Sequence, residues 1–236
     1  MICPVWIYRV DLFRNIDIAT IAIQFAVLLF SLSIHEASHA WMADRLGDYT
    51  ARYLGRVTLN PIPHIDPIGT ILFPLLQFFT HFPLIGWAKP VPINPIHLRN
   101  PHRDQIFISL AGPASNLLAA VLAFCLLVVL KIASPEARGF IDIGLLSQGS
   151  YLAPILLIVY YAMIINVLLA FFNLIPIPPL DGHWILYGLL PRGAASAIER
   201  MGSFGFLILY ALMFFGVFSI ILSPVVGFIV GLLRSF

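Results

Sequence analysis

The feature that most constrains this chain is a set of long apolar stretches. Four of them, at about residues 18–45, 105–131, 151–175 and 203–222, are long enough to cross a bilayer as helices. The composition agrees, because 60% of the 236 residues are hydrophobic and only 10% are charged, against roughly 25% charged residues in soluble domains. We therefore expect an all-α polytopic protein, embedded in a lipid bilayer as one domain over residues 1–236.

A fifth apolar stretch, at about residues 67–84, is shorter and is interrupted by Pro74 and Pro83. Because proline breaks helices, we interpret this stretch as a re-entrant hairpin. The segment GWAKPVPINP that follows, at 86–95, has the pattern of a short β region, and it could hold an extended substrate by strand addition. The apolar chain beyond Pro224 adds a partial or complete span, so the prediction is about five or six transmembrane helices. The expected core covers about 18–190, followed by C-terminal helices at about 200–236.

The hairpin decides which helix ends can meet. If residues 67–84 turn back, the first and third spans end on the same face of the membrane; a single crossing would put these ends on opposite faces. The hairpin topology also collects six basic residues on that face, namely Arg45, Arg52, Arg56, Lys89, Arg99 and Arg103. The opposite loop, at about 132–150, holds only Arg138, with Lys131 at its edge. By the positive-inside rule, the first face is cytoplasmic.

The first span carries three ionisable residues near its end, in the sequence HEASH: His35, Glu36 and His39. Each costs on the order of 2–4 kcal/mol inside a bilayer, so ionisable groups there are rare and mostly functional. His35 and His39 are four residues apart and share one helix face, where both can bind a single zinc ion. Glu36 is offset by about 100° and can take a proton from water at that ion.

A catalytic zinc ion takes three protein ligands and leaves one position open. The stretch FFNLIPIPPLDGHW, at 171–184, ends the third span with three prolines and is followed by Asp181. With the hairpin topology, Asp181 returns to the face that holds His35 and His39, and it becomes the candidate third ligand. A helix N-cap in a loop is the alternative. Asn173 could donate a hydrogen bond to a developing oxyanion or simply cap its helix.

Three motifs together, HEASH, AGPASN at 111–116 and NLIPIPPLDG at 173–182, resemble those of the site-2 proteases, the zinc metalloproteases that cleave within membranes. The segments GRVTLNPIPHIDPIGT, at 55–70, and GWAKPVPINP are similar to the compact prokaryotic branch that has no PDZ domain. The resemblance extends over about residues 18–190.

The resemblance implies one zinc ion per chain, held by three ligands: His35, His39 and Asp181. It implies that Glu36 is the general base, that Asn173 lies near the scissile carbonyl, and that Asn116 and Gly112 line the site. It further implies a zinc metalloendopeptidase of a prokaryotic cell membrane, with its active site nearer the cytoplasmic face. The substrate would be a transmembrane protein. Nucleic acid is not an expected partner, since the net charge is only +2, and the sequence does not indicate an oligomeric state.

Other readings fit part of the pattern. A zinc transporter can carry an HExxH-like motif in a span, although the remaining spans here hold few polar residues. A zinc protease with a glutamate as third ligand would need Glu136 or Glu199. A non-catalytic membrane scaffold would keep the metal without chemistry, and an intact Glu36 argues against it.

Three further residues have open roles. His64 and Asp66, in PHIDP, could order the hairpin or gate the site, and we interpret His64 as a solvated loop histidine. His183 could be a hydrogen-bonding partner of Asp181.

Overall fold

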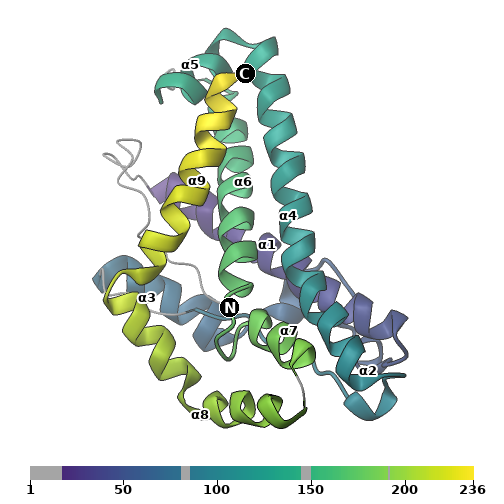
Figure 1. The fold of residues 1–236 in the computed structure, drawn as a ribbon. Coiled ribbons are helices and arrows are strands. Elements are labelled where there is room, and N and C mark those ends of the chain that lie inside the picture. Colours follow the sequence, from purple (N-terminus) through teal and green to yellow (C-terminus); the bar gives the residue numbers. More distant parts are fainter. Residues whose placement is uncertain (1–17, 81–85, 145–149, 191) are drawn as a thin grey trace.

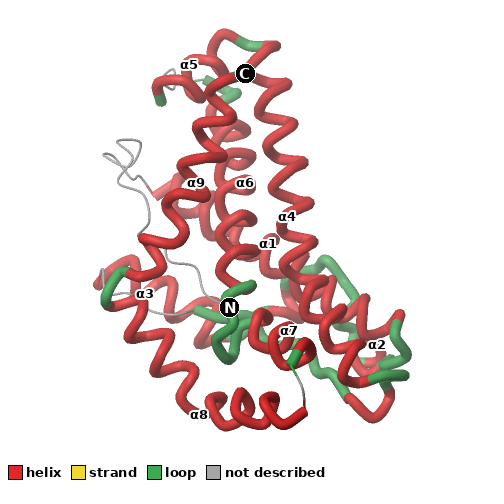
Figure 2. Tube along the Cα trace, in the orientation of Figure 1, coloured by secondary structure: helices red, strands yellow, loops and turns green. Residues whose placement is uncertain are grey.

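The computed structural model describes residues 18–80, 86–144, 150–190 and 192–236. Its nine α-helices within these residues are α1 (Ile18–Arg45), α2 (Thr50–Tyr53), α3 (Phe73–Thr80), α4 (Pro101–Ala133), α5 (Pro135–Ile143), α6 (Ala153–Asn173), α7 (Asp181–Leu189), α8 (Arg192–Phe214) and α9 (Val217–Ser235). Three short helical turns are η3 (Ile62–His64), η4 (Pro67–Leu72) and η5 (Pro95–His97). The described part of the chain contains no β-strand (Figure 2). The expectation of an all-α fold is confirmed.

Four of these helices are long and apolar enough to cross a membrane: α1, α4, α6 and α9. The first three correspond to the first three predicted spans. The fourth prediction, 203–222, is wrong because the helix is interrupted at Gly216, whose φ of 71° is a left-handed conformation that favours glycine. Helix α8 ends at Phe214, and the fourth candidate span is α9, which contains Pro224. The predicted total of five or six spans is not confirmed.

Helix α6 is the central span. In its most apolar stretch of 18 residues, 67% of the residues are buried. In the corresponding stretches of α1, α4 and α9, only 22–28% are buried. A helix that is apolar on all sides is stable only where other helices or lipid surround it, and α6 packs against α1, α4 and α9. The outer helices instead expose large apolar side chains that suit lipid, including Leu118, Leu122, Val129 and Ile132 of α4 and Ile220 and Phe228 of α9.

The helices divide the molecule into two ends (Figure 1). Helix α5 and the C-terminus lie at one end, and α2, α7 and α8 lie at the other. The last turn of α1 lies beside the start of α4, because Ala43 packs in one cluster with Leu98 and Ile108. The connection between α1 and α4 therefore begins and ends at the same end of the molecule.

That connection contains the predicted hairpin and the predicted short β region. Residues 81–85, which include Pro83, lie outside the described residues, so the re-entrant hairpin stays a prediction. The short β region is not formed within the described residues. The backbone N–H groups of Trp87 and Lys89 donate to the carbonyls of Gly69 and His64, at 3.1 and 2.9 Å. Pro90, Pro92 and Pro95 lack an N–H group and cannot extend this pairing into a regular ladder.

Candidate metal centre and active site

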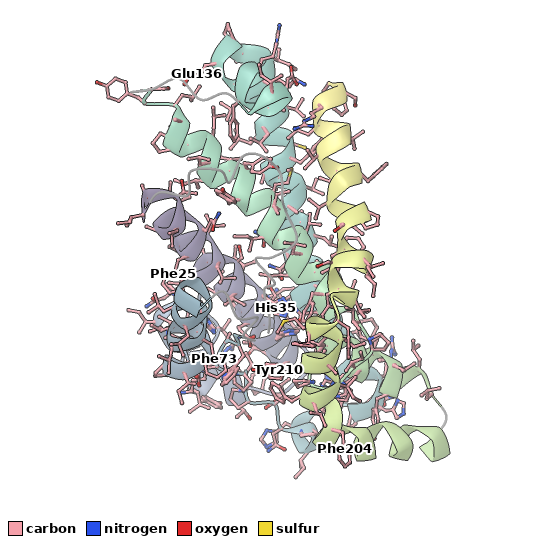
Figure 3. The ribbon with its side chains drawn as sticks, turned by 90° about the vertical axis from the view of Figure 1, so that its left-hand side faces the viewer. Phe25, His35, Phe73, Glu136, Phe204 and Tyr210 are labelled. Carbon is pink, nitrogen blue, oxygen red and sulfur yellow. The ribbon has the colours of Figure 1, made fainter. Side chains whose placement is uncertain are left out.

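Three predicted ligands meet in the interior of the helix bundle. The Nε2 atoms of His35 and His39, on one face of α1, are 2.8 Å apart. The carboxylate of Asp181, at the first residue of α7, lies 2.9 Å from Nε2 of His35 and 3.3 Å from Nε2 of His39. Figure 3 shows His35 surrounded by helices rather than at the outer surface. The structure thus joins one end of α1 to a segment far along the chain.

These three side chains fit a zinc ion. In a tetrahedral site with bonds of 2.0–2.1 Å, ligand atoms lie about 3.3 Å apart, and the distances between the three side chains are 2.8–3.3 Å. Both imidazoles are buried, with 0% of His35 and 6% of His39 exposed. Two imidazoles and one carboxylate form a donor set typical of catalytic zinc. Their role as ligands stays a prediction that the geometry supports.

The other ring nitrogen of each histidine has an acceptor. Nδ1 of His39 donates to the carbonyl of Ile108, at 2.6 Å. Nδ1 of His35 donates to Oδ1 of Asn116, at 2.5 Å. A hydrogen on Nδ1 leaves Nε2 with its lone pair, which is the form that binds a metal. Asn116 thus contacts His35 on the side opposite Nε2. Its predicted role in the site stays a prediction.

Gly112 explains how α4 can pass so close to the two histidines. A Cβ atom at this position would overlap Nε2 of both His35 and His39. Any side chain at residue 112 would thus occupy the space that a metal ion needs. The expectation that Gly112 lines the site agrees with this geometry.

Asp181 is held by the irregular chain that follows α6. The N-cap position of α7 is Leu180, and no side chain caps this helix. The predicted alternative for Asp181, a helix N-cap, is therefore not what the structure contains. Gly182 packs so closely on the carbonyls of Leu174 and Ile175 that a Cβ would overlap them. This contact seats the first turn of α7 against the end of α6.

Glu36 is buried beside the histidines. Two further buried polar side chains, Arg56 and His64, interact electrostatically with its carboxylate. The guanidinium of Arg56 donates to the carbonyls of Lys89 and Pro90. Burial lowers the pKa of Arg56, and the Glu36 carboxylate opposes that shift. The predicted general base therefore shares its surroundings with a buried cation.

The interpretation of His64 as a solvated loop residue is wrong. Only 2% of His64 is exposed, its Nε2 donates to the carbonyl of Thr58 at 2.9 Å, and burial lowers its pKa. Asp66 accepts hydrogen bonds from the N–H groups of Ile68 and Gly69, at 3.0 and 2.8 Å, and so caps η4. Both residues order the chain that leads into the predicted hairpin.

Asn173 and His183 make local contacts. Asn173 is the last residue of α6, and its Nδ2 donates to the carbonyl of Leu169 at 2.7 Å. Its proximity to a scissile carbonyl stays a prediction. Nδ1 of His183 donates to the carbonyl of Leu180 at 2.5 Å, so this atom does not support Asp181.

Sequence reasoning missed two polar residues behind the site. Ser31 of α1 and Asn166 of α6 are buried and contact Asn116 through hydrogen bonds. A signal was available, because an amide in the middle of an apolar span usually faces other helices rather than lipid.

The glutamate alternative for the third ligand is not supported. Glu136 lies on α5, at the end of the molecule remote from His35 (Figure 3). The side chain of Glu199 lies outside the described residues.

Comparisons with known proteins agree with this picture. The model of peptidase family M50 matches residues 23–216 of the chain. A Bacillus subtilis protein named "Putative zinc metalloprotease YwhC" is 36% identical over 200 residues, which are 85% of this chain and 84% of that protein. "Putative zinc metalloprotease Rip2" of Mycolicibacterium smegmatis is 31% identical over 185 residues. The match covers 78% of this chain and 64% of that protein. No solved structure gives a significant match.

Proposed function

The chain belongs to peptidase family M50, the family of the site-2 proteases, and from this premise we propose that it is an intramembrane zinc metalloprotease. It hydrolyses peptide bonds within or near the transmembrane segments of other membrane proteins. One observation carries the proposal: His35, His39 and Asp181 converge, with Glu36 adjacent, among helices whose composition suits a bilayer. The comparisons do not favour a zinc transporter or a non-catalytic scaffold.

We assign each residue of the site one role in holding or orienting the metal ligands. We assign His35, His39 and Asp181 the role of holding zinc, and Ile108 and Asn116 the role of orienting the two imidazoles. When bound, zinc supplies a Lewis acid that polarises the scissile carbonyl and lowers the pKa of water.

Glu36 acts as the general base. It takes a proton from the attacking water as the oxygen bonds to the carbonyl carbon. It then passes that proton to the amine nitrogen when the carbon–nitrogen bond breaks. The buried position of Glu36 keeps bulk water away from this transfer.

The substrate segment must unwind before it can be cleaved, because its carbonyls are hydrogen bonded while it is helical. We propose that the segment KPVPIN, at 89–94, pairs with the unwound substrate. Three hydrogen bonds support a fixed position for this segment. Arg56 donates to the carbonyls of Lys89 and Pro90, and the backbone N–H of Lys89 donates to the carbonyl of His64.

The protein is an integral membrane protein, and we propose that its active site lies nearer the cytoplasmic face of a prokaryotic cell membrane. The six basic residues named above belong to the end that carries α2 and the start of α4, which the positive-inside rule assigns to the cytoplasm. Similar proteins occur in Bacillus subtilis and Mycolicibacterium smegmatis.

The proposal is tested first by the metal content of the full chain, purified in detergent. Wild type and Glu36→Gln should each retain about one zinc ion, whereas His39→Ala and Asp181→Asn should lose it. In proteoliposomes, wild type should cleave members of a panel of transmembrane segments fused to a fluorescent protein. A chelator should stop this cleavage, and Glu36→Gln should slow it by roughly 10²–10⁴-fold.

Two results would contradict the proposal. If wild type retains no zinc, the metalloprotease assignment fails. If Asp181→Asn binds zinc as tightly as wild type, the third ligand is another residue.

A further inference from the structure

Behind the candidate zinc site, a chain of hydrogen bonds joins three spans. Nδ2 of Asn116, on α4, donates to Oδ1 of Asn166, on α6, at 2.6 Å, and to the carbonyl of Ser31, on α1, at 3.2 Å. Nδ2 of Asn166 donates to Oγ of Ser31 at 2.9 Å and to the carbonyl of Ala162 at 2.8 Å. Oδ1 of Asn116 remains for Nδ1 of His35.

The donor and acceptor of each hydrogen bond in this network are fixed, because two of the acceptors are backbone carbonyls. The carbonyl of Ala162 cannot donate, so Asn166 must turn its NH₂ group toward it and its oxygen toward Asn116. The oxygen of Asn166 and the carbonyl of Ser31 then both require the NH₂ group of Asn116. Asn116 is left with its oxygen toward His35.

The orientation of Asn116 decides the tautomer of His35. An oxygen opposite Nδ1 requires a hydrogen on Nδ1 and leaves the Nε2 lone pair facing His39 and Asp181. A reversed amide would present its NH₂ group to Nδ1. The hydrogen of the neutral ring would then move to Nε2, and that tautomer cannot bind a metal through Nε2.

We propose that Asn166 is a positioning residue of the zinc site, acting through Asn116 to hold His35 in its metal-binding tautomer. This inference rests on the proposed zinc centre, since it gives the His35 tautomer its consequence. Asn166 makes no hydrogen bond to His35, His39 or Asp181. Its oxygen, at 2.6 Å, is the nearer of two acceptors that hold the NH₂ group of Asn116 away from His35; the carbonyl of Ser31, at 3.2 Å, is the other. Asn166 is thus two hydrogen bonds away from His35, with Asn116 between them.

The competing explanation is that Asn166 only stabilises the packing of the three helices. Such a role would affect the stability of the protein without changing the zinc affinity of the folded form. The two roles therefore separate when zinc affinity is measured well below the unfolding temperature.

The test compares two substitutions of Asn166 in the full chain. Asn166→Leu keeps a similar volume and removes the nearer acceptor of the Asn116 NH₂ group, so that only the longer hydrogen bond to the Ser31 carbonyl opposes reversal of the amide. Asn166→Asp restores that acceptor together with a donor, because a carboxyl among apolar helices is neutral. It offers a carbonyl oxygen to Asn116 and an O–H group to Ser31 or Ala162. Ser33→Ala is the control, since the buried Ser33 hydroxyl donates to the carbonyl of Leu29 in its own helix and, among the described residues, makes no hydrogen bond to another span.

Zinc affinity, measured by competition with a chelator, should fall by roughly 10–100-fold in Asn166→Leu, the effect of losing an outer partner of a metal ligand. Asn166→Asp should restore most of this loss, and Ser33→Ala should match wild type. If Asn166→Leu binds zinc like wild type while its unfolding temperature falls, the inference is wrong and the residue only stabilises helix packing. If wild type binds no zinc, the proposed function itself has failed.

A second measurement does not depend on the folding of any variant. In zinc-loaded wild type labelled with ¹⁵N-histidine, NMR should show His35 with its hydrogen on Nδ1 and none on Nε2. A His35 ring that binds zinc through Nδ1 would overturn the inference.

Discussion

Nε2 of His35, on α1, lies 2.9 Å from a carboxylate oxygen of Asp181, 146 residues later in the chain. This contact requires α1 and α6 to end at the same end of the molecule, because Asp181 follows α6 by a few residues only. One crossing of the membrane between α1 and α4 would have separated the two residues by the thickness of the bilayer, about 30 Å.

Gly112→Ala should abolish zinc binding without unfolding the protein. The new methyl group would overlap Nε2 of both His35 and His39, where the metal has to sit. Gly227→Ala is a matched control, because nothing lies within 4 Å of a Cβ at that helical position. Zinc content and the unfolding temperature of both variants check the prediction. A Gly112→Ala protein with one zinc per chain would show that the metal binds elsewhere.

The stabilising contribution of the Asp48 carboxylate should be lost in acid. Burial raises the pKa of Asp48, but hydrogen bonds from Thr50, the N–H of Asn94 and His97 lower it further, so the net shift is downward. A carboxyl whose pKa is lower in the folded than in the unfolded protein stabilises the fold above the unfolded pKa of about 3.9. This contribution is lost as pH falls through the folded pKa.

Asp48→Asn removes that dependence. The variant should be less stable than wild type by about 1–3 kcal/mol at pH 7, since a fully buried acceptor loses its charge. The difference in free energy of unfolding should shrink below about pH 4. Denaturant unfolding between pH 3 and 7 measures both quantities. A constant difference across this range would contradict the assigned role.

Lys131 should stabilise the far end of the bundle without affecting the zinc site. Its Nζ pairs with Asp142 at 2.6 Å and donates to the carbonyls of Leu233 and Arg234, at 3.3 and 2.8 Å, at the end of α9. Lys131→Met leaves these acceptors without their cation and should cost about 1–3 kcal/mol of unfolding free energy, less than for a fully buried pair because Asp142 is partly exposed. Zinc affinity should stay at the wild-type value, because this end lies opposite α7 (Figure 1).

Asp142→Asn is the comparison for that variant. It removes one charge but keeps the two carbonyl contacts of Lys131, so the loss of stability should be smaller. An equal loss in the two variants would mean that the ion pair, rather than the contact with α9, carries the effect.

Val91→Pro should weaken cleavage while zinc content stays at one per chain. Proline removes the N–H group that an extended substrate would need for pairing with residues 89–94. We expect a rise in KM of up to about tenfold, the effect of one lost hydrogen bond. Val91→Thr keeps both the N–H group and the shape, and it should behave like wild type. Unchanged cleavage by Val91→Pro would exclude strand addition at this position.

Local properties of the sequence were sufficient for much of the fold and part of the site. The bilayer-length apolar runs predicted α1, α4 and α6, because crossing hydrocarbon requires consecutive apolar residues within one helix. The pairing of His35 with His39 follows from their spacing of four residues, since the helical repeat alone puts them on one face. The proline-rich ending of α6 likewise predicted where the chain leaves that helix.

Other features depended on segments that are distant in the sequence, and only the tertiary structure decided them. The break at Gly216 moved the fourth span to α9, although the apolar composition is continuous on both sides. His64 is buried because Thr58 and Lys89 fold around it, which a polar loop sequence does not reveal.

The same holds for the outer layers of the site. The requirement for a glycine at 112 arises only because α4 packs closely against the two histidines of α1. The amide of Asn166 orients His35 only because α1, α4 and α6 pack at one level. The sequence by itself thus determined the first three spans and the pairing of His35 with His39, because both depend on local properties of one helix. Packing between helices brought Asp181 to the two histidines and fixed the direction of the hydrogen bonds among Ser31, Asn116 and Asn166, because these contacts require atoms from several helices at once.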